Sequence, residues 1–275
     1  MKQHHRMIKL QKLSFLFVVL TFLSCGPSSE EQAEKKLAEV KALKEAGNFN
    51  LAKLKIDTLL SEFGALEEKA EAAKQLLLEI NISEQERNLA YLDSSLQAQE
   101  ALLQPMLKNF IESDEYGSEK ILIHRRQRPE NSYNRTFLRA HLKPSGEFYI
   151  SSRYHGTQWI HHKQIRVYYR NQEVSSLKIE EDDFNNRRFE DGEFKWEIVT
   201  YRDGKDNGVV DFIAKNYDQP LRVQFRGKKY EYIILERFDR EAIRDAYEIS
   251  FLLKEISQIK EEQARAKEAI LQLKK

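Results

Sequence analysis

The chain has 275 residues, of which 41% are hydrophobic and 32% are charged, with 10 glycines, 5 prolines and one cysteine. This composition excludes a low-complexity or largely disordered chain, and a single cysteine leaves no intrachain disulfide to form. The formal net charge is only +1, so a preference for an acidic or basic partner has to come from the distribution of the charges.

The N-terminal segment is basic at first and then apolar. Basic residues precede an apolar run from Leu13 to Leu23, and the segment ends in Phe22-Leu23-Ser24-Cys25-Gly26, which resembles the lipobox of bacterial lipoproteins. The run is too short to span a bilayer comfortably. We therefore expect residues 1–24 to be a signal peptide that is removed, and Cys25 to be lipidated. More than one acyl chain on that residue would hold the protein durably on a membrane.

Residues 25–116 are predicted to form a helical arm, because long stretches lack Gly and Pro and carry apolar residues at spacings of three and four. Ser28-Ser29-Glu30-Glu31 can cap a first helix that is expected to run to about Ala46. Gly47-Asn48-Phe49 is expected to turn the chain into a second helix that runs to Phe63-Gly64, followed by a third helix over about 65–80 and a fourth from near Ser83. The turn at residues 47–49 and the helix after it resemble the second half of a tetratricopeptide repeat, with Gly47, Phe49, Ala52 and Ile56 at the matching positions. Since repeat arrays need about three units and no second copy follows, the pattern favours a helical hairpin over a peptide-binding groove.

Two segments carry a near-heptad pattern that is typical of paired helices. The fourth helix should start with a capping box at Ser83 and Glu86 and be kinked or restarted at Pro105. The last helix, assigned to residues 237–275, contains neither Gly nor Pro. The apolar seam of the fourth helix includes Ile82, Leu89, Leu92, Leu96, Leu103, Met106 and Phe110; that of the last helix is Ile249, Leu252, Ile256, Ile259, Gln263, Ala266, Ile270 and Leu273. We expect these two helices to pack antiparallel as a coiled-coil-like stalk.

Residues 117–236 change to alternating aromatic and β-branched runs, which predict strands. The predicted strands cover 120–124, 136–142, 147–151, 164–169, 174–179, 194–201, 221–225 and 230–235, with a short helix at 208–215. Lys143-Pro144-Ser145-Gly146 is a hairpin turn signal. The predicted fold class is therefore α+β: N-terminal helical hairpins and two long paired helices, with an inserted and mostly antiparallel β domain.

The β segment contains a strongly basic stretch. Residues 120–172 hold 11 Lys/Arg against 2 Asp/Glu, and arginines alternate with aromatic residues. In an exported protein this chemistry favours a phosphate- or carboxylate-bearing glycan, a lipid headgroup or an acidic face of an envelope protein over nucleic acid. A solvated sheet face is the simpler alternative. The candidate ligand-binding residues are Arg125, Arg126, Arg128, Arg139, Tyr154, Trp159 and Arg166.

The sequence offers no catalytic motif. His155, His161 and His162 lie close together, but neighbouring residues of a strand would point to opposite faces, and exposed loop histidines are the favoured interpretation over a metal site. The segment 203–208 lacks the required ligands of a calcium loop and is interpreted as a turn that caps the short helix. Nucleophile-elbow, Walker and dinucleotide motifs are absent. We expect no cofactor, no metal and no assignable catalytic residue.

Three further segments carry a family resemblance. They are residues 86–91 (Glu-Arg-Asn-Leu-Ala-Tyr), residues 212–214 (Phe-Ile-Ala) after an Asp-Gly-Lys turn, and residues 247–250 (Tyr-Glu-Ile-Ser). With the lipidation signal, they resemble uncharacterised envelope lipoproteins of Bacteroidetes. The resemblance implies a cell-envelope address, with the outer membrane favoured, and implies no activity.

These observations predict a lipid-anchored envelope protein and favour a non-enzymatic binding or scaffolding module over an enzyme. The alternative is a hydrolase that acts on envelope polysaccharide or peptidoglycan through carboxylates of the β domain. The membrane, reached through the N-terminal lipid, and an envelope protein or acidic glycan are the expected partners. The oligomeric state and the membrane face stay open.

Overall fold

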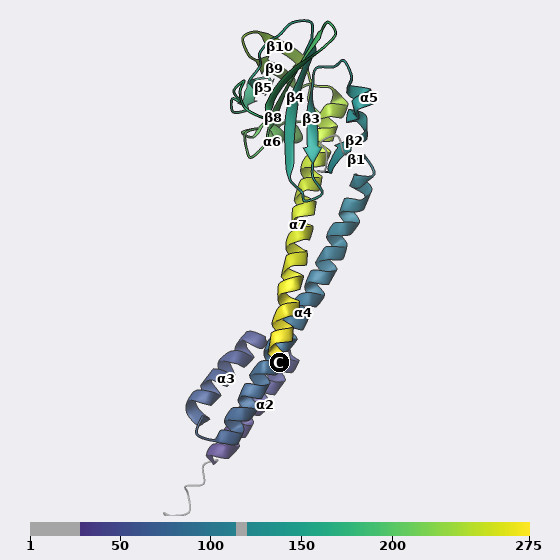
Figure 1. The fold of residues 1–275 in the computed structure, drawn as a ribbon. Helices are drawn as coiled ribbons and strands as arrows, with labels where there is room; N and C mark the ends of the chain where they lie inside the picture. Colours follow the sequence, from purple (N-terminus) through teal and green to yellow (C-terminus); the bar gives the residue numbers. More distant parts are fainter. Residues whose placement is uncertain (1–27, 114–119) are drawn as a thin grey trace, which may run out of the picture. The chain divides into compact units, whose positions relative to one another are not determined.

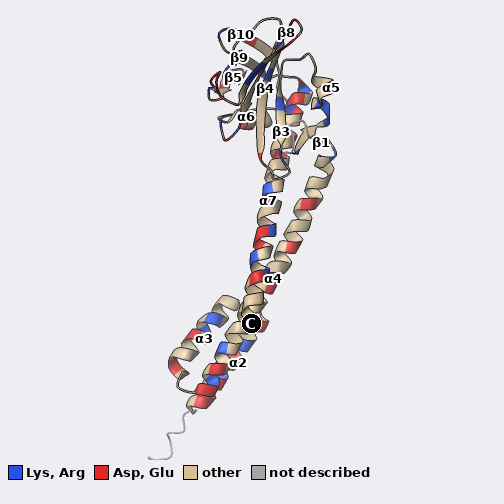
Figure 2. Ribbon diagram, in the orientation of Figure 1, with Lys and Arg blue, Asp and Glu red and all other residues tan. Residues whose placement is uncertain are grey.

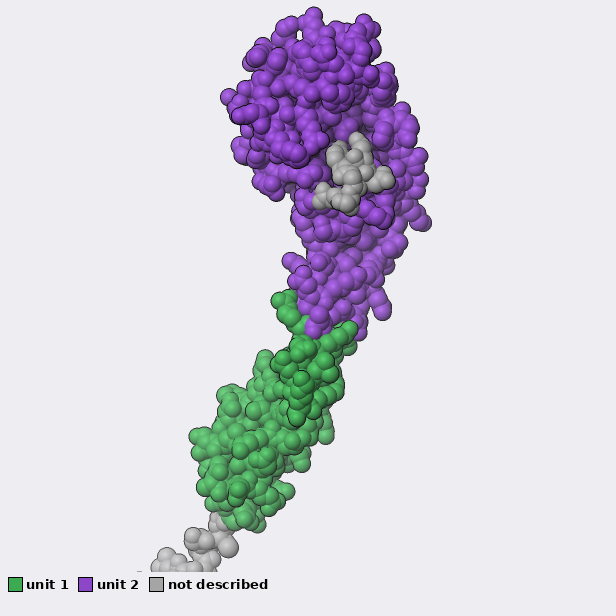
Figure 3. Space-filling model, viewed as in Figure 1, with its two compact units in different colours: residues 1–91, 265–275 green, residues 92–264 purple. Residues whose placement is uncertain are grey.

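The structure is a computed structural model that describes residues 28–113 and 120–275. The predicted signal peptide and Cys25 lie outside these residues. The chain divides into two compact units, which are coloured separately in Figure 3: residues 1–91 with 265–275, and residues 92–264. Two long helices, α4 (Glu67–Leu107) and α7 (Arg237–Leu273), contribute to both units.

The first unit contains a helical hairpin. Its first helix, α2 (Ser29–Glu45), begins with a capping box: the Ser28 hydroxyl accepts the backbone N–H of Glu31, and the Glu31 carboxylate accepts the N–H of Ser28. Both groups would otherwise lack a helical partner. A turn at Gly47, where φ is +72°, leads into α3 (Phe49–Phe63). Lysines, arginines and acidic residues are interspersed along both helices (Figure 2).

The hairpin shares an apolar core with the first part of α4. The buried members of this core are Leu37, Val40, Phe49, Ala52, Ile56, Leu59, Ala73, Leu76 and Ile80. Arg87 of α4 closes the turn, since its Nη1 donates to the carbonyl oxygen of Gly47 at 2.9 Å and its guanidinium carbon lies 4.4 Å from the centre of the Phe49 ring. The hairpin predicted from the sequence is confirmed.

α4 is one continuous helix where the sequence pattern predicts two. The capping signal at Ser83 does not start a new helix, because residues 67–104 contain neither Gly nor Pro and the helical backbone continues through them. Pro105 lies inside the helix, which ends two residues later at Leu107. The missing proline N–H therefore affects only the final turn.

The predicted antiparallel pairing of α4 and α7 is confirmed. In the second unit Gln263 Nε2 donates to Asp93 Oδ1 at 2.7 Å, and Lys260 Nζ lies 3.1 Å from Glu100 Oε1. In the first unit Lys274 Nζ lies 3.5 Å from Glu86 Oε1. In these pairs the residue number increases along α4 as it decreases along α7, which is the pattern of antiparallel helices. The residues of both predicted seams are buried or half-buried.

The second unit contains a six-stranded antiparallel sheet in the order β1-β2-β3-β4-β8-β7. Figure 1 labels β1, β2, β3, β4 and β8 of this sheet. The strands are β1 (Phe110–Ser113), β2 (Ile121–His124), β3 (Phe137–Leu142), β4 (Phe148–Gly156), β7 (Asn186–Asp191) and β8 (Phe194–Tyr201). A 3-10 turn, η1 (Arg125–Gln127), and a short helix, α5 (Pro129–Ser132), connect β2 to β3.

A four-stranded antiparallel sheet completes this unit, in the order β10-β9-β5-β6. Its strands are β5 (Gln164–Tyr169), β6 (Gln172–Ser175), β9 (Arg222–Arg226) and β10 (Tyr230–Ile234), and α6 (Val209–Lys215) precedes β9. Inward side chains of both sheets share one core with α6 and with Ile243, Ala246 and Ile249 of α7. The inserted, mostly antiparallel β domain is therefore confirmed.

Two strands were not predicted, and one lies elsewhere than expected. β1 follows α4 almost directly, and β7 reads Asn-Arg-Arg-Phe-Glu-Asp, without the alternation of a half-buried strand. Polar edge strands give a weak sequence signal. β6 covers 172–175 rather than 174–179.

Within the described residues, none of the helices combines the length and apolar character needed to cross a membrane.

Candidate functional site

The outer face of the four-stranded sheet is rich in tyrosine and arginine. Alternate residues of β5 and β9 point inward, where Ile165, Val167, Val223 and Phe225 are fully buried. The residues between them point to the other side, because successive side chains of a strand lie on opposite faces. We call this side the outer face.

Pairing of the four strands arranges the outer face in three rows. The first row is Tyr230, Arg226 and Gln164; the second is Tyr232, Gln224, Arg166 and Ser175; the third is Ile234, Arg222, Tyr168 and Glu173. Rows two residues apart are separated by about 7 Å, so the three rows extend over about 13 Å along the strands. Such a surface accommodates a ligand of several rings.

Gln224 organises the centre of the outer face. It is 7% exposed; its Nε2 donates to the Tyr232 hydroxyl at 2.7 Å, and its Oε1 accepts from Arg226 Nε at 2.8 Å. Arg226 also approaches the Ser175 hydroxyl, with Nη1 and Oγ 3.5 Å apart. Because both ends of the amide are engaged, the arginine and the tyrosine are held in place before any ligand arrives.

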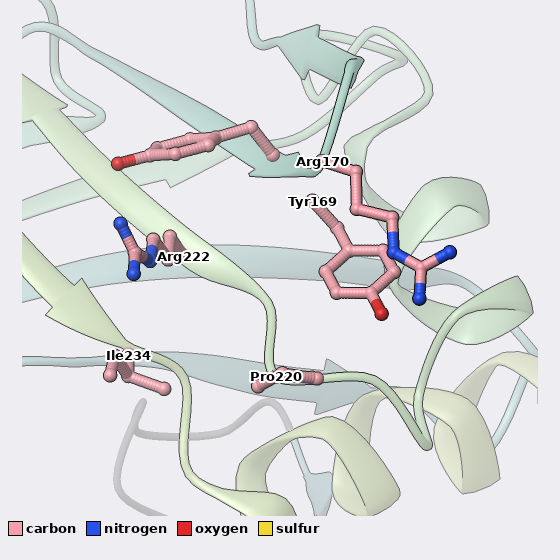
Figure 4. A pocket seen from close by; sticks show the side chains of 6 residues that line it. Tyr169, Arg170, Pro220, Arg222 and Ile234 are labelled. Carbon is pink, nitrogen blue, oxygen red and sulfur yellow. The ribbon is translucent and has the colours of Figure 1, made fainter.

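The third row borders a cavity of about 360 Å³, which we call the tyrosine pocket. It is lined by Tyr168, Tyr169, Arg170, Pro220, Arg222 and Ile234 (Figure 4). Arg170 follows β5 with a φ of +52°, and its guanidinium carbon lies 4.9 Å from the centre of the Tyr169 ring. Within residues 28–113 and 120–275, no carboxylate oxygen lies within 4.0 Å of the guanidinium of Arg170 or Arg222. Both cations are therefore available to an anion.

The first two rows border a larger cavity of about 630 Å³, the basic groove. Its basic lining residues are Lys163, Arg166, Lys178, Arg226 and Lys228. Part of this charge is neutralised, since Lys163 Nζ lies 2.7 Å from Glu180 Oε2 and Arg166 pairs with Glu173. The basic groove thus extends the positive outer face, but its Lys163 and Arg166 are paired with carboxylates, whereas Arg170 and Arg222 of the tyrosine pocket are not paired with a described carboxylate.

The residues predicted to bind a ligand lie on several elements. Arg125 and Arg126 belong to η1, and Arg128 follows it. Arg125 Nε donates to the carbonyl oxygen of Lys108 at 2.7 Å, and Arg126 Nη1 lies 3.9 Å from a carboxylate oxygen of Glu241.

The remaining predicted residues are also dispersed. Arg139 of β3 is fully buried, and Tyr154 of β4 is 6% exposed and donates from its hydroxyl to the carbonyl oxygen of Gln158. Trp159 lies beneath Lys195. Of the seven residues, Arg166 alone lines a cavity of the outer face. The structure does not bring the set together in one site.

A serine, a histidine and a glutamate form a hydrogen-bonded chain inside the core. Ser152 Oγ lies 2.8 Å from His162 Nε2, and His162 Nδ1 lies 2.9 Å from Glu197 Oε2. Burial lowers the pKa of His162. Burial also tends to raise the pKa of Glu197, but the hydrogen bond and charge of His162 and the backbone N–H groups of His161 and His162 outweigh it and hold this pKa at about 2.

The hydrogen-bonded network of Ser152, His162 and Glu197 is connected like a nucleophilic triad, but it is not accessible to a substrate. All three side chains are 0% exposed, and Ser152 lines neither cavity of the outer face. A catalytic nucleophile has to reach its substrate. The network instead fixes the loop 160–162 to β8, because Glu197 accepts the backbone N–H groups of all three loop residues at 2.7–2.8 Å. That loop leads directly into β5, so the network positions the outer face.

The histidines do not assemble into a metal site in the described part of the chain. There, no three His, Cys, Asp or Glu side chains are placed to hold a metal ion. His155 stacks on Phe194, and His161 Nδ1 lies 3.1 Å from a Glu181 carboxylate oxygen. The segment 203–208 forms turns, and Asp206 accepts the backbone N–H of Val210 at the start of α6. The predicted capping turn is confirmed.

Comparison with known proteins adds no relative: no protein-family model, curated protein or solved structure matches the chain.

Proposed function

We propose that this protein is a lipid-anchored protein of the cell envelope that binds an acidic glycan on the outer face, without catalysis. The observation that carries the proposal is the tyrosine pocket, where Arg170 and Arg222 stand beside Tyr168 and Tyr169 with no carboxylate of the described residues to neutralise them. The lipidation signal that ends at Cys25 supports the envelope address.

The chemistry of the tyrosine pocket fits a sugar that carries carboxylates. A guanidinium offers planar, paired donors that match a carboxylate. Tyrosine combines an apolar ring face, suited to the C–H face of a sugar, with a hydroxyl that can exchange hydrogen bonds. Three rows of such side chains let one chain of sugars contact several of them at once.

Binding is favoured over hydrolysis by the state of the acidic residues. The carboxylates that line the basic groove, Glu180 and Glu181, lie within 4.0 Å of Lys163, and Glu181 also pairs with Arg188. Carboxylates held by cations are poor proton donors. The arginines and tyrosines therefore carry the proposal.

The proposal is tested with a uronic-acid trisaccharide, a neutral trisaccharide of the same linkage, and protein that begins at residue 26. Calorimetry should show binding of the acidic sugar and weaker or no binding of the neutral one. Arg222→Gln should weaken binding of the acidic sugar by about tenfold or more, as expected for loss of a charged hydrogen bond. Arg265→Gln, an exposed substitution on α7, is the matched control and should leave binding unchanged. Equal binding of both sugars, or of both variants, would contradict the proposal.

A further inference from the structure

The second unit contains another arginine-lined cavity, on the six-stranded sheet. Strand pairing places Arg153 of β4 and Arg187 of β7 on either side of Ile198 of β8. Neighbouring strands are about 4.8 Å apart, so the two arginine backbones lie about 10 Å from each other on the same face. Long side chains from these positions can converge above Ile198.

Arg202 contributes a third guanidinium. It follows β8 on the same face, its guanidinium carbon lies 4.2 Å from the centre of the Tyr149 ring, and its Nη2 donates to the Tyr149 hydroxyl at 2.6 Å. The cavity that Arg153, Arg187 and Arg202 line has a volume of about 380 Å³, and we call it the phenylalanine pocket. Stacking fixes Arg202 and leaves its remaining N–H groups for a ligand.

Two exposed phenylalanines complete the wall. Phe184 is 78% exposed and lies under the guanidinium of Arg187, whose central carbon is 4.6 Å from the ring centre. Phe189 is 48% exposed and stacks on Trp196. Large apolar side chains at this exposure are costly to hydrate, and their position beside arginines indicates a ligand with both an apolar and an anionic part.

Among the residues that the structure describes, no acidic side chain lines the phenylalanine pocket. In the described ranges, the guanidinium groups of Arg187 and Arg202 have no carboxylate oxygen within 4.0 Å. Asp183, which directly precedes Phe184, is engaged elsewhere: its Oδ1 accepts the backbone N–H of Asn185, and its Oδ2 lies 3.4 Å from Lys205 Nζ. The positive charge of the pocket is therefore not offset by this neighbour.

We infer that the phenylalanine pocket is a second ligand site, which binds a phosphate monoester attached to an apolar or planar group. A phosphate dianion can bond more than one guanidinium, which favours it over a single carboxylate where arginines converge. The phenylalanines contact the group that carries the phosphate. A phosphorylated lipid and a soluble aryl or alkyl phosphate share this chemistry.

The test uses protein from residue 26 onward with phenyl phosphate, inorganic phosphate, and vesicles of phosphatidylcholine with or without phosphatidic acid. Phenyl phosphate should bind more tightly than inorganic phosphate. Arg187→Gln should weaken both by about tenfold, whereas Phe184→Ala should weaken phenyl phosphate alone. Both residues are exposed, so the variants should fold, which circular dichroism and thermal melting check. Arg265→Gln, an exposed substitution on α7, is the control and should not change phosphate binding.

The vesicles identify the source of the phosphate. Capture by phosphatidic acid vesicles that disappears in Arg187→Gln supports a lipid ligand, and binding of phenyl phosphate without capture supports a soluble one. Absence of binding by all three phosphates, or binding that Arg187→Gln leaves intact, would overturn the inference. Because the acidic-sugar test depends on Arg222 and this test on Arg187, either site can fail without the other.

Discussion

Glu197 shows how a buried charge is held in this fold. Its two oxygens accept the backbone N–H groups of Ile160, His161 and His162 and lie against His162 Nδ1. Each buried donor that loses its acceptor costs about 1–3 kcal/mol. The carboxylate is therefore a requirement of the loop 160–162 rather than of any reaction.

Glu197→Gln should lower the free energy of unfolding by roughly 3 kcal/mol, because one oxygen is replaced by an amide N–H₂ that faces donors instead of accepting from them. Urea denaturation followed by tryptophan fluorescence measures the change. Ser152→Ala removes only the outer hydrogen bond of the chain and should cost about 1 kcal/mol. A smaller loss for Glu197→Gln than for Ser152→Ala would show that the loop does not depend on the carboxylate.

The sequence identifies part of the candidate site. Arg166 was predicted as a ligand residue, and Tyr168, Tyr169 and Arg170 belong to the same basic and aromatic stretch. Arg222 was not predicted, because it joins the outer face only through pairing of β5 with β9, more than 50 residues further along the chain. The signal that could have identified it was the alternation Arg-Val-Gln-Phe-Arg of β9. Alternation in the sequence predicts which residues of a strand share a face, but it does not predict which strands lie beside it.

At the scale of elements, turns with special backbone angles decide where strands begin and end. The turn after β3 contains Gly146 with a φ of +85°, and a Cβ built there would lie 2.9 Å from the carbonyl oxygen of Ser250 in α7. The turn between β7 and β8 contains Gly192 with a φ of +60° and no heavy atom within 4 Å of such a Cβ. The two turns differ mainly in what surrounds them.

Gly146→Ala should therefore destabilise the protein more than Gly192→Ala. Both substitutions place a side chain at positive φ, which costs about 1–2 kcal/mol. Gly146→Ala also forces the hairpin away from α7, so we expect a total loss of roughly 3 kcal/mol. Thermal and chemical denaturation of both variants measure the difference. Equal losses would mean that the hairpin can move away from the helix without cost.

Elements with strong periodicity were predictable, and those without it were not. The seams of α4 and α7 identify both helices and their pairing, and the turn signal 143–146 identifies the hairpin of β3 and β4. β7 escaped prediction because five of its six residues are polar. The break predicted near Ser83 was wrong because a capping signal starts a helix only where the preceding backbone is not already helical.

For the whole molecule, the strongest prediction concerns residues outside the described structure. The lipobox-like segment predicts a lipid on Cys25. Membrane association should then depend on that single sulfur atom.

Cys25→Ser should abolish incorporation of radiolabelled palmitate and move the protein from the membrane fraction to the soluble fraction. Stable anchoring requires at least two acyl chains, and the serine variant can receive none on its side chain. Ser24→Ala keeps a small residue before the cysteine and should remain labelled and membrane-bound. Unchanged fractionation of Cys25→Ser would refute the envelope address and leave the two ligand sites to be judged separately.

The contribution of α7 to the β core affects how the chain is made. Ile243, Ala246 and Ile249 close a core whose strands were all synthesised earlier. During translation, domains generally fold as units, so a domain waits for the segment that completes its core. Here the β strands emerge from the ribosome without one wall of their core and stay open until almost the entire polypeptide has been released. A polypeptide in that state could still be threaded through a translocation channel, as the predicted signal peptide would require.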